Sequence, residues 1–189
     1  MKISMPETKN PWKTLRSELI YESAWISINK HDVLNPAGNP ALYSTVNFKN
    51  IAIGILPLDE NLNTYIVGQF RYPINKYSWE IPEGGGHLGI EPLESAAREL
   101  SEETGISAKK WTKIQEMHLS NSVTDELAIL YIAQDLSFGE SHPEETEELQ
   151  VKKIHFNDLY DLVCDGVITD SLTVSAVLKT KLLLIEGKL

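Results

Sequence analysis

Cysteine, basic charge and long apolar runs are all scarce in this sequence of 189 residues. The only cysteine, Cys164, excludes an intramolecular disulfide and a cysteine-rich zinc site, so a reducing cytoplasm is the expected location. The 17 Lys and Arg against 27 Asp and Glu give a net charge of −10, which argues against sequence-independent binding to nucleic acid or anionic membrane. No apolar run approaches the roughly 20 residues that span a bilayer. A phosphate-bearing substrate must therefore be attracted by something other than net charge.

The N-terminal part predicts a small sheet of its own. Polar and apolar residues alternate at 24–29 and at 42–48, and a turn around Asn35-Pro36 separates the two runs. Residues 1–48 are therefore expected to form antiparallel strands with one apolar face. Because so few strands are not stable alone, we expect them to pack on the main domain or on a second copy, as a homodimer.

Residues 49–189 are expected to form the main domain. The apolar runs at 51–56 and 64–70 predict a buried hairpin. Further strands are expected at 77–81, 112–119, 127–133 and 149–156, and helices at 157–164 and 171–185. Strands mixed with a few helices indicate an α/β or α+β sandwich.

One further helix is unusually rich in glutamate. Pro92 suits its first turn and Gly105 its left-handed end. At about 100° per residue the buried stripe is Leu93, Ala96, Ala97, Leu100 and Thr104. Glu99, Glu102 and Glu103 lie on one flank of that stripe. Such a flank is commonly only a solvated acidic surface.

The glycines at 84–86 favour a more specific interpretation. They follow a strand and predict a short loop that returns the chain to the helix and brings backbone carbonyls near the carboxylates. Carboxylates at positions i, i+3 and i+4 beside a carbonyl form an oxygen-rich pocket that suits hard divalent cations. The pattern therefore predicts a metal site.

This segment resembles the Nudix box, the signature of a family that hydrolyses diphosphates. The box has glycine, five residues, glutamate, seven residues, and then R-E-U-x-E-E-x-G-U, with U apolar. Gly84 begins the match, and Arg98–Ile106 completes the second half without a mismatch. Ile90 stands where the box has its first glutamate, and Glu91 follows one residue later. Because that first glutamate mostly supports the loop and helix, the resemblance implies retained metal binding with different supporting hydrogen bonds.

The resemblance also implies a Nudix-type α/β/α sandwich with a mixed sheet, and roles for the residues of the box. Glu99, Glu102 and Glu103 are the implied metal ligands, together with the backbone carbonyl of Glu83. Arg98 orients the carboxylates, so Arg98 and Glu103 belong to the catalytic group. The implied cofactor is Mg²⁺ or Mn²⁺, in two or more ions, which would let an acidic protein accept a diphosphate.

From Trp12 onward the chain is similar to the Nudix branch that cleaves ADP-ribose and other nucleoside diphosphate sugars. The matching sequence segments are residues 67–73, 79–86 and 166–170. In that branch the N-terminal strands pack across a dimer, and the partner contributes to the base pocket. The implied reaction is metal-dependent hydrolysis of a nucleotide-sugar pyrophosphate bond to a nucleoside monophosphate and a sugar phosphate.

Four residues are candidates for substrate binding. Arg71 can bind a phosphate with two hydrogen bonds, or it can form a surface ion pair. Trp25 and Trp79 can stack on a base, although an aromatic residue in an alternating strand is more often part of the core. Glu80 can accept a hydrogen bond from the base or sugar.

Two loops complete the predicted site. The segment 119–126 lacks the proline that this branch often carries there, but its polar side chains suit a substrate loop, with Ser122 as the contact. The acidic run at 144–148 precedes a strand, as does the loop that supplies the general base in the ADP-ribose enzymes. Glu147 is the first candidate for the base, followed by Glu148 and Glu145.

Two alternatives stay open. Within the family, the substrate could be a nucleoside triphosphate or a dinucleotide polyphosphate. Outside catalysis, Ile90 would be compatible with a Nudix-like nucleotide-binding module, although the intact acids and Arg98 favour an enzyme.

Overall fold

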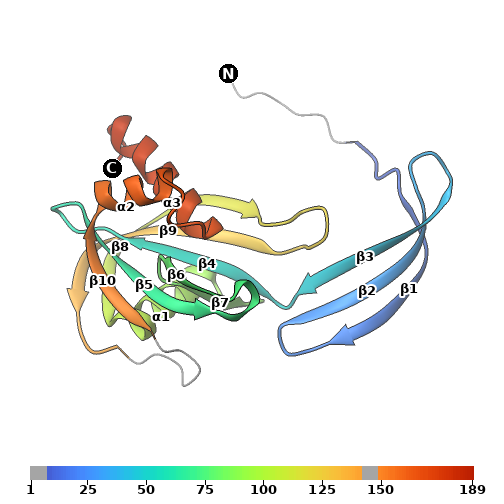
Figure 1. Ribbon diagram of the computed structural model, residues 1–189, viewed down its shortest axis with the longest axis horizontal. Helices are drawn as coiled ribbons and strands as arrows, with labels where there is room; N and C mark the ends of the chain where they lie inside the picture. The colour runs from blue at the N-terminus through green and yellow to red at the C-terminus, as the bar shows by residue number, and fades with distance from the viewer. Residues whose placement is uncertain (1–7, 142–148) are drawn as a thin grey trace. The chain divides into compact units, whose positions relative to one another are not determined.

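The computed structural model describes residues 8–141 and 149–189 of the chain (Figure 1). The chain divides into two compact units, one of Met1–Lys49 with Ser120–Asp125, the other of Asn50–Leu119 with Glu126–Leu189. The sequence had placed the division after residue 48 and had not assigned the segment at 120–125 to the N-terminal part.

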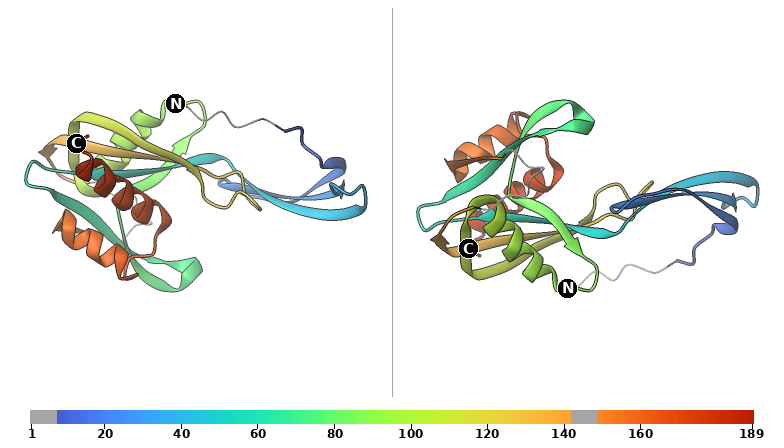
Figure 2. Two further views of the ribbon diagram at one scale, coloured as in Figure 1. Left: turned by 90° about the horizontal axis from the view of Figure 1, so that it is seen from above. Right: turned by 90° about the horizontal axis from the view of Figure 1, so that it is seen from below.

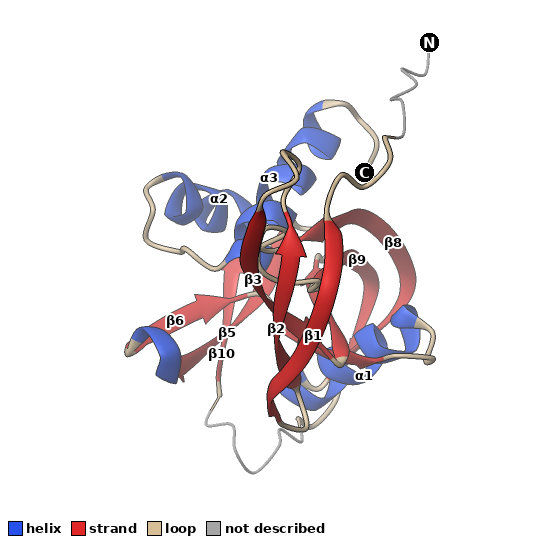
Figure 3. Ribbon diagram, turned by 90° about the vertical axis from the view of Figure 1, so that its right-hand side faces the viewer, coloured by secondary structure: helices blue, strands red, loops and turns tan. Residues whose placement is uncertain are grey.

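The first unit is a three-stranded antiparallel sheet in the order β1 (Lys13–Glu22), β2 (Ile26–Leu34) and β3 (Pro40–Phe48) (Figure 3). Every residue of β1 is exposed. The segment 120–125 attaches to β3, where the Asp125 carboxylate accepts hydrogen bonds from the Asn47 side chain and the Phe48 backbone, both at 2.8 Å. The unit therefore joins parts of the chain that are far apart in sequence.

Within its described residues, the second unit contains two sheets and three α-helices. Its elements are β4 (Asn50–Pro57), β5 (Asn63–Arg71), the 3₁₀ turn η1 (Tyr72–Ile74), β6 (Lys76–Glu80), β7 (Glu83–His87), α1 (Pro92–Thr104), β8 (Ile106–His118), β9 (Leu127–Phe138), β10 (Gln150–His155), α2 (Phe156–Cys164) and α3 (Ser171–Ile185). One sheet has the order β7-β4-β9-β8, with β4 and β9 parallel and the other pairs antiparallel, and the second has the order β10-β5-β6. None of the helices within the described residues has the length and apolarity to cross a membrane.

Helices cover both faces of the mixed sheet because alternate residues of its central strands point to opposite sides. Leu56 and Leu130 pack in one core cluster with Leu172 and Val177 of α3. Ile53, Ile55 and Ile129 pack in another with Ala96 and Leu100 of α1. Figure 2 shows α1 and α3 on the two sides of this sheet. This is the α/β/α sandwich with a mixed sheet that the resemblance to the Nudix family implies, and it confirms the α/β or α+β class predicted from the residue patterns.

The predicted glycine loop is wrong, because Gly84, Gly85 and Gly86 lie in β7 and pair with β4. Glycine is needed there for close packing rather than for a turn. A Cβ on Gly84 would overlap the carboxyl group of Glu99, and one on Gly86 would lie 2.9 Å from Cγ1 of Ile51. The missing side chains let β7 approach α1 and β4 closely.

α1 begins and ends where the sequence predicts, with Pro92 in its first turn and Gly105 at φ 69° after its last residue. Its buried face differs from the expected stripe, since Ser95 and Glu103 are buried and Ala97 is exposed. The buried Glu103 carboxylate accepts a hydrogen bond from the backbone of β7. A charged residue thus occupies a position that periodicity would give to an apolar one.

Candidate active site

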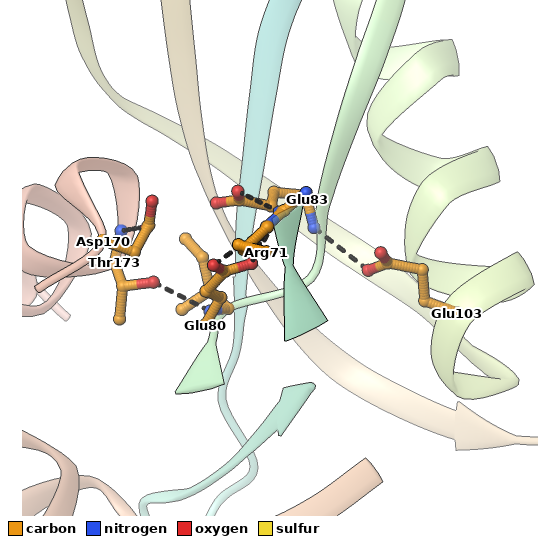
Figure 4. Close-up of polar contacts among 7 residues, drawn as sticks. Arg71, Glu80, Glu83, Glu103, Asp170 and Thr173 are labelled. Atoms are coloured by element: carbon orange, nitrogen blue, oxygen red, sulfur yellow. Dashed lines mark hydrogen bonds and ion pairs between the residues drawn. The ribbon is translucent and has the colours of Figure 1, made fainter. Parts of the chain in front are cut away.

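The link between β6 and β7 is the point at which three elements meet (Figure 4). The Ile81 N–H donates to Oγ1 of Thr173 on α3 at 2.9 Å. The Pro82 carbonyl accepts from the Ile55 N–H of β4 at 2.8 Å. The Glu83 N–H donates to Oε2 of Glu103 on α1 at 3.0 Å. Because Pro82 has no N–H, the backbone donors of this link are those of Ile81 and Glu83, and both are bonded.

The glutamates of α1 lie against β7. Glu103 is 2% exposed, and the carboxylate of Glu99 lies over Gly84. Arg98 donates to Glu99 Oε1 and to Glu102 Oε2, each at 2.6 Å, and to the Gly85 carbonyl at 3.1 Å. Burial alone would lower the pKa of Arg98, but the charges of Glu99 and Glu102 raise it. Arg98 therefore stays charged and holds two of the predicted ligands beside the glycine strand.

Ile90, at the position of the missing first glutamate, donates its backbone N–H to the His87 carbonyl at 3.2 Å. Ile90 is 45% exposed. Glu91 is the N-cap residue of α1, and its side chain makes no capping hydrogen bond. The helix start depends on Pro92 and on backbone hydrogen bonds to the Glu91 carbonyl.

A second group of charges lies at the end of β5 and β6. Both carboxylate oxygens of Glu80 accept from Arg71, at 2.6 to 3.0 Å, and Arg71 Nη2 also lies 2.9 Å from Glu83 Oε1. The side chain of Glu80 is 3% exposed and that of Arg71 is 37% exposed. Burial would lower the pKa of Arg71, but its contacts with Glu80 and Glu83 outweigh that effect and raise it. The guanidinium is thus a permanent positive charge that is partly open to solvent.

Asp170 brings a third carboxylate to this group. One oxygen from each of Glu80, Glu83 and Asp170 lies within 4.8 Å of the others. Burial raises the pKa of Glu83 well above its usual value, and the negative charges of Asp170 and Glu80 raise it further. Oε2 of Glu83 is buried and has no hydrogen-bond partner among the described residues. Among the described residues, Arg71 bonds two of these three carboxylates, those of Glu80 and Glu83.

This arrangement fits a hard divalent cation. The side-chain atoms of this group that could bind a cation are all carboxylate oxygens, and one of them is buried with no hydrogen-bond partner among the described residues. Mg²⁺ and Mn²⁺ prefer oxygen ligands of this kind, and a bound cation would relieve the repulsion among the acids. Arg71 adds a planar donor suited to a phosphate oxygen.

The predicted site residues other than Trp79 fall into three groups. Arg71, Glu80, Glu83, Arg98, Glu99, Glu102 and Glu103 lie together in the second unit, on β5, β6, β7 and α1. Trp25 and Ser122 belong to the first unit, where Trp25 is 63% exposed and the Ser122 carbonyl accepts from the Tyr43 hydroxyl at 2.6 Å. Glu147 and Glu148, with Glu145, lie outside the described residues.

Trp79 has contacts typical of a core residue. It packs against the cluster that contains Ile66 and Leu159, and its ring meets Tyr77 edge-on with centroids 5.6 Å apart. Nζ of Lys152 lies 5.8 Å from the centroid of the Trp79 ring. A Cβ on Gly68 would lie 2.8 Å from that ring, so the strand beneath it requires glycine.

Sequence reasoning missed Asp170 and Thr173, and it considered Glu83 only as a metal ligand through its backbone carbonyl. Asp170 is the last residue of the segment Gly166–Asp170, which matches the family but was not assigned to the site. The structure makes it the N-cap of α3, where its Oδ2 accepts from the Thr173 N–H at 2.7 Å. The cap could be predicted from an aspartate before a helix. Its approach to Glu80 and Glu83 could not.

Comparison with known proteins identifies the family of the chain. The family model for the NUDIX domain matches residues 49–166, and the model for the nucleoside diphosphate sugar hydrolase N-terminal domain matches residues 12–46. An ADP-ribose pyrophosphatase of Bacillus subtilis (strain 168) is 33% identical over 167 residues, which cover 87% of this chain and 90% of that protein. An ADP-ribose pyrophosphatase of Mycobacterium tuberculosis (strain ATCC 25618 / H37Rv) is 26% identical and covers 90% of this chain and 83% of its own. The crystal structure of an ADP compounds hydrolase superposes with a TM-score of 0.84 at 20% identity, over 97% of this chain and 100% of that one.

Proposed function

Because the chain belongs to the Nudix family and is therefore a hydrolase, we propose that it cleaves the pyrophosphate bond of a nucleoside diphosphate sugar such as ADP-ribose. The products are a nucleoside monophosphate and a sugar phosphate. The observation that carries the proposal is the contact of α1 with β7, where Glu103 binds the Glu83 backbone and Glu99 lies over Gly84. The N-terminal match and the names of the two bacterial relatives support the substrate class.

In the proposed site, Glu99, Glu102, Glu103 and the Glu83 carbonyl hold Mg²⁺ or Mn²⁺, in two or more ions. When bound, the cations supply positive charge for the diphosphate and lower the pKa of a coordinated water. Arg98 contributes by holding Glu99 and Glu102 through two ion pairs. The positive charge of the bound cations would thus offset the repulsion between the acidic protein and the anionic diphosphate.

Arg71 is the proposed phosphate ligand from the protein itself. The side chain of Arg71 is 37% exposed and so is open to a phosphate oxygen, while its Nε and Nη2 donate to Glu80 and Nη2 also lies 2.9 Å from Glu83 Oε1. Since both oxygens of Glu80 accept from Arg71, Glu80 acts in this mechanism through Arg71, and a contact with the base or sugar is the weaker assignment. Trp25, Trp79 and Ser122 remain proposed contacts for the nucleotide.

The proposed general base is Glu147, with Glu148 and Glu145 as the next candidates. The base takes a proton from the attacking water. The water oxygen forms a bond to one phosphorus of the diphosphate, and the bond from that phosphorus to the bridging oxygen breaks. Arg71 stabilises the negative charge that accumulates on the phosphate oxygens.

We further propose that the chain acts as a homodimer in the cytoplasm. The sheet of the first unit exposes large apolar side chains, including Leu15, Leu19 and Ile20, each 55% or 56% exposed. A second copy would cover such a face. Light scattering should then give twice the chain mass of 21.2 kDa, and a monomer at micromolar concentration would contradict this assignment. The lone, exposed Cys164 suits a reducing compartment, and the charge of −10 disfavours nucleic acid or membrane as a partner.

The test is hydrolysis of ADP-ribose in Mg²⁺ by the wild-type chain and by Glu103→Gln, with the products identified. The glutamine keeps an oxygen for the Glu83 N–H but loses the charge, so the fold should persist while turnover falls by at least about 100-fold. A panel with nucleoside triphosphates and dinucleotide polyphosphates discriminates the substrate class. A fully active Glu103→Gln enzyme would refute the site, and a wild-type chain that cleaves only triphosphates would refute the substrate.

A further inference from the structure

A buried hydrogen bond ties α3 to the strand end that carries the proposed cation site. Its donor, the Ile81 N–H, and its acceptor, Thr173 Oγ1, lie 2.9 Å apart and 92 residues apart in sequence. Both residues are 0% exposed. Bulk water does not compete for the bond at such a position, so breaking it would cost more than breaking an exposed bond.

The bond acts two residues away from the proposed ligand carbonyl. Pro82 fixes its own φ and contributes only a carbonyl, which β4 holds through the Ile55 N–H. The next donor in the chain, the Glu83 N–H, is bound by Glu103. The direction of the Ile81 peptide therefore helps to set the position of Glu83 relative to α1.

Thr173 is itself held in place by the start of α3. The Asp170 carboxylate accepts from the Thr173 N–H at 2.7 Å, and the same carboxylate lies near those of Glu80 and Glu83. Figure 4 shows Thr173 and Asp170 on one side of the β6–β7 link and Glu103 on the other. The link is thus clamped between the first turn of α3 and the last turn of α1.

We propose that Thr173 is a positioning residue for the cation site, because its hydroxyl oxygen holds the Ile81 amide and so keeps Glu83 in register with Glu103. Thr173 touches neither metal nor substrate in this role. The proposal deepens the proposed function and rests on its premise that Glu83 and Glu103 hold divalent cations.

α3 offers a matched control. Thr180 is also 0% exposed, but its hydroxyl has no hydrogen-bond partner within the described residues. Thr→Val preserves the shape of the side chain and removes the hydroxyl, so Thr173→Val and Thr180→Val make the same chemical change on one helix. Only the first deletes an acceptor that the site uses.

The experiment measures Mn²⁺ binding to the full chain by electron paramagnetic resonance without substrate, and then the Mg²⁺ concentration that gives half-maximal turnover. Thr173→Val should weaken Mn²⁺ binding by about 10-fold and raise the Mg²⁺ requirement to a similar extent, as losses in the support of metal ligands commonly do. Thr180→Val should match the wild type in both measurements. Thr173→Ser, which keeps the hydroxyl, should restore the affinity.

Wild-type Mn²⁺ affinity in Thr173→Val, with only a lower melting temperature, would overturn the proposal and reduce Thr173 to a packing residue. If Thr173→Val does not fold, Thr173→Ala and Thr173→Ser decide the matter, because both lose the methyl group and only alanine loses the acceptor. Equal affinities in these two variants would also overturn it. A wild-type chain that binds no Mn²⁺ would instead refute the metal premise of the proposed function.

Discussion

Gly84→Ala tests the close approach of β7 and α1. A Cβ at this position would overlap the carboxyl group of Glu99, so that carboxylate must move. The neighbouring Gly85→Ala is the matched control, because the three atoms nearest to its Cβ all belong to the Asn50 side chain, at 3.2 Å for Nδ2 and 3.7 Å for the next two. Neither glycine has a positive φ, so alanine is compatible with both backbones.

The expected magnitudes separate an effect on the site from an effect on stability. Replacing glycine by alanine in a compatible backbone stabilises by about 0.4–1 kcal/mol. Losing the Arg98–Glu99 ion pair, whose side chains are 39% and 12% exposed, costs at most about 1 kcal/mol. These terms nearly cancel, so the melting temperature should change by less than about 4 °C. A displaced ligand should instead weaken Mn²⁺ binding by about 10–100-fold, which equals about 1.4–2.7 kcal/mol.

The assay combines thermal unfolding in EDTA with a Mn²⁺ titration for the wild type, Gly84→Ala and Gly85→Ala. We expect three similar melting temperatures and a weakened Mn²⁺ affinity in Gly84→Ala alone. Equal affinities in the two variants would show that the contact of Glu99 with β7 has no part in binding the cation. A collapse of stability in Gly84→Ala would show that α1 cannot adjust, and that the magnitudes above are wrong.

Two further predictions concern the acidic residues. Glu147→Gln should lower kcat by about 100-fold or more with a smaller change in substrate affinity, since general bases contribute about 10²–10⁴-fold. Steady-state kinetics check this, with Glu140→Gln, an exposed glutamate upstream, as the control. Equal kcat values in the two variants would show that Glu147 is not the base. Glu83→Gln should raise the melting temperature without divalent ions by about 2–4 °C at pH 8 and by less at pH 5. The sign follows from burial and the charges of Asp170 and Glu80, which raise the pKa of Glu83 in the folded chain, so that its ionisation removes stability as pH rises toward that pKa. Thermal unfolding in EDTA at the two pH values checks it, and an equal shift at both would contradict the assigned pKa direction.

Local patterns predicted the regular elements well. α3 spans Ser171–Ile185, as its periodicity indicates, and α1 ends at Gly105 as expected. β8 and β9 extend beyond the predicted strands, because pairing between them continues past the segments whose alternation is clear. The sequence patterns did not predict β1, since all of its residues are exposed and its sequence has no buried face.

The acidic residues of the candidate site were predicted unevenly. The glutamates of α1 could be identified from their spacing on one helix, together with the sequence motif of the Nudix box. The buried state of Glu103 could not, because an isolated helix would place a charge in solvent. The hydrogen bond to the Glu83 backbone, which reverses that preference, exists only once β7 lies beside α1.

The local sequence determined where the helices lie and that the site is acidic, because propensity, periodicity and charge act over a few positions. The tertiary structure alone decided which distant groups share one volume. It brought Arg71 to Glu80, Asp170 to Glu83 and Thr173 to Ile81, and it joined the segment 120–125 to β3. These contacts arise from the packing of whole elements against a common sheet, and no local rule specifies which side chains then meet.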